Sequence, residues 1–530
     1  MIPPLLLDIQ PDHSVLDMCA APGSKTAQII EMLHRDSINS MIFLKEKTEK
    51  EKMKKMDGLV VANDVDNKRC YMLVHQANRL HSPTCVVINQ DASRMTPFYQ
   101  TDENGVKGLL KFDRVLADVP CSGDGTIRKN YDVWSKWNQA NANNFHIIQL
   151  KIAKRGAELL KKGGLLSYST CSLNPLEDEA VVSALLNYAK GGLELIDASK
   201  VLPKLKCRTG LEDWLVMSRE NVIFNSYSDV PENLHKQIYE SSFPPDNVKE
   251  LNLKYCIRVL PHYQNTGGFF IAILKKTVDI LPWENEQKQE DCEELNDDKP
   301  KQQKRSKRMW GHKEDPYFFF KSDDNDFGPL KEFFHLNHNT DFDYHHLADR
   351  ASVGKRRNIY YLTEKAADFI ASNDHAKIIN GGTRAFGRMD IGHSECNFRL
   401  TQEGVSTIMP FFVHRLNCFD PESFNYHHKF AIIQMGRNDF VELLKRETIV
   451  CEEFQDKEFV SKLQRYHYPG CFVVYTRLKR PGKENYDSDF ILPMCVFRGG
   501  KNLRAYVQRQ ERMHMLRICG EEPELKGDLK

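Results

Sequence analysis

Residues 17–26 read Asp-Met-Cys-Ala-Ala-Pro-Gly-Ser-Lys-Thr, and this loop decides the fold class. A strand-like stretch precedes it at 14–18, and a helical pattern with apolar residues on one side follows at 26–34. A strand, a tight turn of small residues and a helix, in this order, are the nucleotide-binding arrangement of a doubly wound fold. The turn can bind a ligand because backbone N–H groups are free at the helix start. The sequence therefore predicts an α/β protein with a Rossmann-like, doubly wound parallel sheet.

The glycines of this loop do not fit the two common phosphate-binding motifs. The spacing Gly-x-x-x-x-Gly-Lys-Ser/Thr is missing, and so is the Gly-x-Gly-x-x-Gly pattern of dinucleotide sites. A ligand that carries a carboxylate instead of phosphates still suits such a helix start, and S-adenosylmethionine is one. The loop residues expected to bind it are Cys19, Ala20, Ala21, Pro22, Gly23, Ser24 and Lys25.

The next two predicted strands also end in polar side chains. The stretch 58–63 leads to Asp64, whose carboxylate is placed to bind ribose hydroxyls, and 85–90 leads to Asp91, which could accept from an adenine amino group. Acidic residues at strand ends also serve as plain helix caps. Three consecutive strand ends with suitable groups make a cofactor site the stronger interpretation.

Two cysteines follow further predicted strands. Cys121 comes after the apolar run 112–119, and Cys171 comes after 165–169. Thiols at the carboxyl ends of separate strands could converge on one substrate atom, although a free cysteine is more often a small core residue. The Asp-x-Pro before Cys121, the Thr before Cys171 and the loop upstream favour a functional role for both.

These motifs together resemble the Nol/Nop/Sun RNA cytosine-5 methyltransferases, and most closely the eukaryotic multisite tRNA enzymes of that family. The stretches that carry the resemblance are 19–25, 64–66, 91–93, 118–130, 170–179 and 265–270. The resemblance is strong over most of residues 1–276 and weak over 309–530. It implies a class I S-adenosylmethionine-dependent methyltransferase fold that acts on RNA, most plausibly tRNA.

The resemblance also implies a role for each residue. Cys171 would add as a thiolate to carbon 6 of cytosine, which makes carbon 5 nucleophilic, and Cys121 would assist release of the product. Asp118, which is also expected to bind the cofactor, would hydrogen-bond cytosine N3, and Lys25 would support it electrostatically. A rival assignment remains open, because DNA cytosine-5 methyltransferases use a Pro-Cys thiol as nucleophile, which would be Cys121. The Thr170-Cys171 pair favours the RNA assignment.

Composition is typical of an intracellular enzyme. A chain of 530 residues with 41% hydrophobic content can bury a large core and should form two or more domains. Its 14 cysteines include no Cys-x-x-Cys pair, which favours a reducing compartment and neither a disulfide framework nor a metal site. No apolar run approaches membrane-spanning length. We expect a monomer in the nucleus or nucleolus, with the cytoplasm as a second compartment.

The charge pattern divides the chain. We expect a catalytic domain at 1–277, a disordered charged linker at 278–308 and a C-terminal accessory, RNA-binding domain at 309–530. The linker turns from acidic to basic at 299–308, which could be a nuclear-localisation or RNA-contact tract. A Lys/Glu-rich stretch at 45–55 is interpreted as a surface insertion.

The beginning of the chain differs from the family pattern. Family members carry a substantial segment before the strand that starts here at Ser14, so the N-terminal part of the domain is expected to be missing. Residues 1–10 resemble the tail of the helix that precedes this strand. Two classes of function therefore stay open: an RNA cytosine-5 methyltransferase, or an RNA-binding regulatory protein with this fold and impaired catalysis.

The net charge of only +1 requires RNA to be bound by local basic patches. Arg128 and Lys129, just after the Cys121 loop, are expected to contact phosphates, while Trp134 and Trp137 are interpreted as core residues. In the C-terminal half, strands are predicted at 410–413, 471–475 and 490–492, the last ending at Pro493. The resemblance implies that this half includes a PUA-like barrel.

Overall fold

The structure is a computed structural model, and it describes residues 1–35, 57–102, 104–284, 314–334, 336, 342–351, 355–389, 396–412, 430–465, 470–479 and 490–523. The predicted insertion at 45–55 and the basic tract at 299–308 lie outside the described residues. The predicted domain boundaries at 277 and 308 stay predictions.

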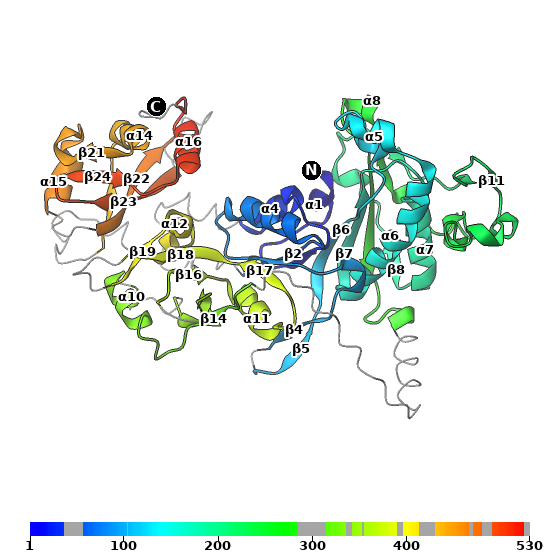
Figure 1. The fold of residues 1–530 in the computed structure, drawn as a ribbon, viewed down its shortest axis with the longest axis horizontal. Coiled ribbons are helices and arrows are strands. Elements are labelled where there is room, and N and C mark those ends of the chain that lie inside the picture. The colour runs from blue at the N-terminus through cyan, green and yellow to red at the C-terminus, as the bar shows by residue number, and fades with distance from the viewer. Residues whose placement is uncertain are drawn as a thin grey trace.

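A single large sheet forms the centre of the N-terminal half (Figure 1). Within the described residues it has ten strands: β17 (Ile378–Gly381), β3 (Cys85–Ile88), β2 (Leu59–Asn63), β1 (Ser14–Asp17), β6 (Phe112–Asp118), β7 (Leu160–Thr170), β13 (Phe269–Lys276), β12 (Ile257–Val259) and β9 (Arg208–Thr209) in spatial order, with β8 (Leu193–Leu195) beside β13. Strands β3, β2, β1, β6 and β7 are parallel, and β13 is antiparallel to β7. The strand order reverses between β1 and β6, which opens a crevice at their carboxyl ends. The predicted doubly wound fold is confirmed.

Helices cover both faces of this sheet, which explains the continuous apolar runs within its strands. Val15 packs with α2 (Ser24–Leu33) and α4 (Asn67–Asn78) on one face, and Leu16 packs with α6 (Gln139–Leu159) on the other, where α7 (Glu179–Ala189) also lies. This alternation follows the period of two along a strand. Figure 1 shows α6 and α7 on one side of the sheet and α1 (Ile2–Leu6) and α4 on the other.

In the part of the C-terminal half that the structure describes, there are two further sheets with helices packed on them. One sheet has the order β14 (Phe318–Phe319), β15 (Leu347–Asp349), β16 (Asn358–Tyr361), β18 (Thr383–Arg388) and β19 (Phe398–Leu400). The other has the order β20 (Ile432–Gln434), β22 (Gly470–Leu478), β23 (Phe490–Arg498), β24 (Asn502–Ala505) and β21 (Thr448–Val450). The helices are α10 (Phe327–Phe333), α11 (Glu364–Ser372), α12 (Gln402–Ile408), α14 (Arg437–Arg446), α15 (Lys457–Arg465) and α16 (Arg509–Ile518). The short strands and turns of the sequence predict a mixed α/β or mostly β C-terminal domain, and this prediction is confirmed.

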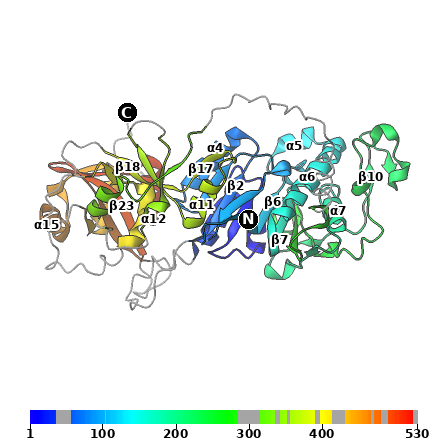
Figure 2. The ribbon, with the colours of Figure 1, turned by 90° about the horizontal axis from the view of Figure 1, so that it is seen from below.

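A strand from the C-terminal half completes the central sheet at one edge. β17 pairs antiparallel with β3, and α11 packs beside it, with the rings of Phe98 and Phe369 5.2 Å apart. The Thr363 hydroxyl donates to the carbonyl of Gly58 at 3.2 Å. Figure 2 shows β17 and α11 next to α4 and β2. The two halves are therefore joined through the sheet itself, which the sequence patterns did not predict.

Two predicted strands differ from the structure. Residues 409–412 form a 3-10 turn after α12, because a short apolar run has no periodicity that separates strand from helix. Strand β23 continues past the predicted end at Pro493. Proline lacks an N–H group, but β24 pairs with β23 only from Val496 onward, so no ladder hydrogen bond is lost at Pro493.

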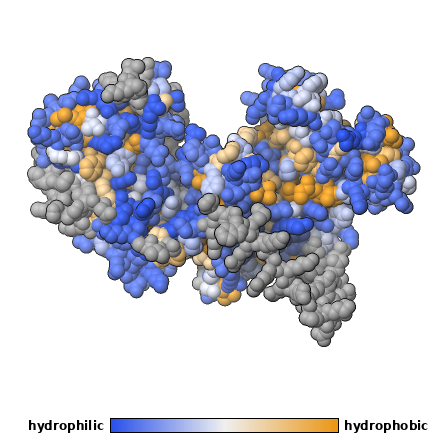
Figure 3. Space-filling view, in the orientation of Figure 1, coloured by the Kyte–Doolittle hydropathy of each residue, from blue (hydrophilic) through white to orange (hydrophobic). Residues whose placement is uncertain are grey.

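Much of the surface is hydrophilic, with hydrophobic residues gathered over the N-terminal half on the face drawn in Figure 3. Among the helices that the structure describes, none is long and apolar enough to cross a bilayer. Two further short antiparallel pairs are present among the described residues, namely β4 (Phe98–Thr101) with β5 (Lys107–Leu110) and β10 (Val216–Met217) with β11 (Ile223–Phe224).

Candidate active site

The two predicted cysteines meet at the carboxyl edge of the sheet. Strands β6 and β7 are parallel neighbours in which Asp118 lies opposite Ser169, so the loops that follow them begin side by side. The sulfur atoms of Cys121 and Cys171 are 3.2 Å apart, which is hydrogen-bond distance and well beyond a disulfide bond of about 2.05 Å. Both thiols are partly accessible.

The surroundings favour ionisation of Cys171 over Cys121. A hydrogen bond from the Cys121 thiol holds the pKa of Cys171 below its usual range, and the Lys25 ammonium acts in the same direction. That hydrogen bond and burial raise the pKa of Cys121, and the Glu177 carboxylate adds to the effect. The thiolate is the reactive form, so Cys171 is the better nucleophile of the two.

A lysine–aspartate pair lies beside the thiols at the crevice between β1 and β6. Lys25, in the first turn of α2, places its Nζ 2.5 Å from the Oδ2 of Asp118 at the end of β6. The Ser169 hydroxyl donates to the other carboxylate oxygen at 2.8 Å, and the Lys25 ammonium lies 5.1 Å from the ring centre of Phe269. The carboxylate is therefore fixed in direction at the edge where both cysteines lie.

Backbone contacts hold three loops together around these side chains. The Gly125 N–H donates to the carbonyl of Cys171 at 3.0 Å, and the Gly268 N–H donates to the carbonyl of Gly125 at 2.7 Å. A Cβ atom on Gly125 would lie 2.6 Å from the Cys171 oxygen, closer than real Cβ contacts allow. The glycine-rich motif at 265–270 thus packs against the cysteine loops.

A buried glutamate joins the two cysteine loops. Glu177 accepts hydrogen bonds from the Ser122 N–H at 2.7 Å and the Ser172 hydroxyl at 2.9 Å, each next to one of the cysteines. The Gln149 amide donates both to Glu177 at 3.1 Å and to the Pro120 carbonyl at 2.9 Å. Burial raises the pKa of Glu177. Sequence reasoning missed this residue, and its place in the 170–179 motif was the available signal.

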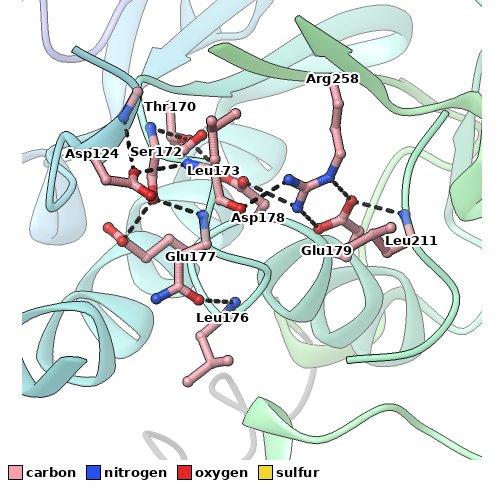
Figure 4. Close-up of polar contacts among 12 residues, drawn as sticks. Asp124, Thr170, Ser172, Leu173, Leu176, Glu177, Asp178, Glu179, Leu211 and Arg258 are labelled. Carbon is pink, nitrogen blue, oxygen red and sulfur yellow. Dashed lines mark hydrogen bonds and ion pairs between the residues drawn. The ribbon is translucent and has the colours of Figure 1, made fainter. Parts of the chain in front are cut away.

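The segment after Cys171 is anchored by a second set of buried charges (Figure 4). Arg258 on β12 forms ion pairs with Asp178 and Glu179, both fully buried, and donates to the Leu173 carbonyl at 2.9 Å. The Thr170 hydroxyl donates to Asp178 at 2.6 Å. The start of α7 is therefore tied to both ends of the Cys171 loop.

The predicted cofactor residues line the carboxyl ends of β1, β2 and β3. The loop 19–25 turns into α2 through Gly23, whose φ of 110° is a left-handed conformation suited to glycine. Asp64 is buried at the end of β2, and Asp91 begins a turn after β3, where its Oδ1 accepts from Ser93. Burial raises the pKa of the Cys19 thiol, so this cysteine lines the loop as a neutral group.

One carboxylate oxygen under this loop has no partner. Asp17 ends β1 and accepts from the Thr26 hydroxyl at 2.8 Å through Oδ2, whereas its buried Oδ1 has no hydrogen bond within the described residues. Burial raises the pKa of Asp17 to about 7. An unpartnered acceptor below a free helix start fits an amino-acid ligand, which presents both an ammonium and a carboxylate. S-adenosylmethionine carries this pair of groups.

The predicted RNA contacts lie next to the Cys121 loop. Arg128 donates to the carbonyls of Pro261 and Thr266 and to the Asn265 side chain, so it braces the neighbouring loop, while Lys129 is exposed. The interpretation of Trp134 and Trp137 as core residues is wrong, because they are 66% and 37% exposed. The short segment that carries both tryptophans has no apolar periodicity, so the sequence pattern could not show that these side chains are exposed.

Comparison with known proteins places the chain. Residues 46–275 match the family described as 16S rRNA methyltransferase RsmB/F, and residues 316–413 and 431–520 match the NSUN2 Pre-PUA and PUA domains. The tRNA (cytosine(34)-C(5))-methyltransferase of Drosophila melanogaster is 40% identical over 98% of this chain and 68% of its own length. The chain belongs to the Nol/Nop/Sun family of RNA cytosine-5 methyltransferases.

Fungal members support the same placement. The multisite-specific tRNA:(cytosine-C(5))-methyltransferase trm4b of Schizosaccharomyces pombe is 34% identical over 97% of this chain and 77% of its own length. The corresponding enzyme of Saccharomyces cerevisiae is 33% identical over 99% and 73%. The PUA match confirms the PUA-like region that the resemblance implied. S-adenosylmethionine is the methyl donor in this family, and the residues around Asp17 and Asp64 fit it.

Replacing Asp64 by Ala is expected to weaken S-adenosylmethionine binding about 10- to 100-fold, because hydrogen bonds to a charged group contribute about 1.5–3 kcal/mol. Isothermal titration calorimetry measures the change. Asp66→Ala is the matched control, since Asp66 caps α4 through the Lys68 and Arg69 N–H groups. It should lower stability and leave the affinity unchanged. Equal affinities for Asp64→Ala and the unaltered chain would remove Asp64 from the site.

Proposed function

We propose that this chain transfers a methyl group from S-adenosylmethionine to carbon 5 of cytosine in RNA, with tRNA as its main substrate. The observation that carries the proposal is the pair of thiols 3.2 Å apart beside the Lys25–Asp118 pair, at the carboxyl ends of parallel strands. The relatives named above are tRNA methyltransferases, which supports tRNA as the substrate.

Each of the four site residues has its own role in the proposed reaction. The Cys171 thiolate forms a bond to carbon 6, and a proton shared between Asp118 and N3 neutralises the negative charge that develops on the ring as carbon 5 becomes nucleophilic. S-adenosylmethionine supplies the electrophilic methyl group. Cys121 then assists the elimination as the base that takes the carbon 5 proton. The electron pair of the C5–H bond restores the double bond between carbons 5 and 6, and the bond between sulfur and carbon 6 breaks, which releases Cys171 as a thiolate. Lys25 keeps positive charge beside Asp118 and Cys171 throughout.

Two alternatives are less well supported. A DNA-type assignment would make Cys121 the nucleophile, but the Lys25 ammonium acts on Cys171 and the Glu177 carboxylate acts on Cys121, which favours the thiolate on Cys171. A regulatory RNA-binding protein with impaired catalysis is not favoured, because the matching relatives over nearly the full chain are methyltransferases.

The decisive test is methyl transfer from labelled S-adenosylmethionine to unmodified tRNA, with the product nucleoside identified by mass spectrometry. We expect 5-methylcytosine in tRNA. Equal methylation of DNA, or a methyl group on an exocyclic amine, would contradict the proposal. The same reaction run on other RNAs defines the range of substrates.

Binding of tRNA should weaken steeply with salt, because phosphate contacts release counterions. We expect Lys129→Ala to reduce the slope of log affinity against log salt by about 1, the value for one lost phosphate contact. Lys162→Ala is the control, since Lys162 lies near the start of β7, at the opposite end of this strand from Cys171, and pairs with Asp279. Filter binding at several salt concentrations measures both. An unchanged slope for Lys129→Ala would remove this phosphate contact.

A further inference from the structure

Helix α5 (Tyr131–Lys136) is unusual because it buries none of its residues. Three large aromatic side chains at spacings of three lie on it or just after it, namely Tyr131, Trp134 and Trp137, which are 79%, 66% and 37% exposed. Residues three apart are neighbours on one side of a helix. Large rings that gather on a surface mark an interaction site more often than single exposed ones do.

This aromatic surface, defined as Tyr131, Trp134 and Trp137, is fixed to the reactive loop. The Trp137 indole N–H donates to the Ser122 hydroxyl at 3.0 Å, and Ser122 follows Cys121 directly. Through Arg128, the preceding turn is held to the loop at 261–266. Figure 1 shows α5 beside α8 (Pro261–Gln264) at one end of the catalytic half. The rings therefore have a set position relative to the thiols.

The charges around the aromatic surface suit a polyanion. Residues 128–137 include three basic side chains, Arg128, Lys129 and Lys136, and one acidic side chain, Asp132, which pairs with Lys136. A protein-binding surface of similar size is typically more apolar and less charged at its centre. Aromatic rings interleaved with basic groups are the composition of single-stranded nucleic-acid sites.

The proposed reaction requires the target cytosine to leave its stack of bases, and aromatic rings can stabilise the neighbouring bases that remain. Carbons 5 and 6 of a stacked cytosine are covered by its neighbours, so an enzyme that acts on them takes the base out of the stack. The nucleotides on either side then lose a stacking partner. Aromatic side chains replace it in complexes with unpaired RNA, and each contributes about 1–3 kcal/mol.

We propose that the aromatic surface of α5 binds unpaired bases next to the target cytosine, with Trp134 as the main stacking ring. This inference rests on the proposed function and adds to it the residues that hold the displaced strand. Trp137 sets the position of the surface through Ser122, and Lys129 lies beside it for the phosphates.

Trp134→Ala tests this directly, because no hydrogen bond or ion pair joins Trp134 to another described residue and its ring is mainly exposed. We expect affinity for unmodified tRNA to fall about 5- to 150-fold, the equivalent of about 1–3 kcal/mol for one stacked base. KM should rise more than kcat falls. The salt slope should stay unchanged, since no charge is removed, which separates stacking from the phosphate contact of Lys129.

Three comparisons make the test decisive. Trp134→Phe should recover most of the affinity, because it keeps an aromatic ring. Tyr188→Ala, which removes an exposed ring on α7, should bind tRNA normally. S-adenosylmethionine affinity should be unchanged in Trp134→Ala, which shows that the fold is intact.

The outcomes separate the two proposals. Unchanged tRNA affinity in Trp134→Ala, with the unaltered chain active on tRNA, overturns the stacking surface and leaves the proposed function intact. An unaltered chain that methylates no RNA overturns both. A defect of Trp134→Ala that appears only with a protein partner added would assign the surface to protein binding and contradict the inference.

Discussion

Cys121→Ala is expected to accumulate a covalent protein–RNA adduct, whereas Cys171→Ala should form none and lose methylation about a thousandfold or more. With Cys121 absent, Cys171 can still add to carbon 6, but release of the product stalls. With Cys171 absent, the bond to carbon 6 never forms. Because the two sulfur atoms are 3.2 Å apart, both can reach the same cytosine ring while they perform different steps.

Denaturing gel electrophoresis with labelled tRNA resolves the adduct from free RNA. Cys207→Ala is the control, because Cys207 is a partly exposed free cysteine away from the site. A mirror-image result, with adduct in Cys171→Ala and none in Cys121→Ala, would establish a DNA-type mechanism. Loss of about 1 kcal/mol of stability in both variants, with no adduct from either and no loss of methylation, would reduce both cysteines to core packing.

Arg258→Ala is expected to lower the free energy of unfolding of the catalytic half by about 3–5 kcal/mol, the typical effect of removing one partner from a buried ion pair. Asp178 and Glu179 are fully buried and would lose the cation with which both pair. The Leu173 carbonyl, two residues after Cys171, would also lose its donor. Methylation should therefore fall together with stability.

The loss of folding free energy in Arg258→Ala should depend on pH in a definite direction. Burial raises the pKa of Asp178 well above its usual value, so the folded chain holds a proton that the unfolded chain releases. Such a group favours folding below its unfolded pKa, near 4, and this contribution is lost as pH rises through the raised value. Without Arg258 the raised pKa should rise further, so the variant should regain part of its stability on acidification.

Denaturant unfolding, followed at several pH values, checks both effects. Arg128→Ala is the matched control, since it removes an exposed arginine whose partners are carbonyls and an amide. Arg128→Ala should lower the free energy of unfolding by no more than about 1 kcal/mol. An Arg258→Ala variant as stable as this control would show that the buried carboxylates are neutral and need no cation.

The sequence was sufficient to predict the main sheet and the groups at its edge. Parallel strands buried on both faces are continuous apolar runs, and the polar residue after each run marks the carboxyl end, as at Asp64 and Cys121. Because these ends meet at one edge, the sequence also indicated that Cys121 and Cys171 would lie together, whereas the places of Lys25 and Asp118 in the site were implied by the family resemblance.

Other features could not be predicted because they depend on distant contacts. Glu177 becomes a shared acceptor only when the loops after β6 and β7 close on it, and no local pattern distinguishes it from a helix-start carboxylate. The exposure of Trp134 depends on the absence of packing partners around α5. The pairing of β17 with β3 joins residues almost three hundred positions apart.

That pairing limits how this protein can be divided or recombined. A fragment without β17 and α11 would leave β3 with unpaired N–H and C=O groups and would uncover the ring of Phe98. Open edges of this kind template pairing between copies and promote aggregation. An exchange of the C-terminal half between genes would therefore have to supply a strand for β3 as well, so the RNA-binding modules and the catalytic sheet are expected to be inherited together.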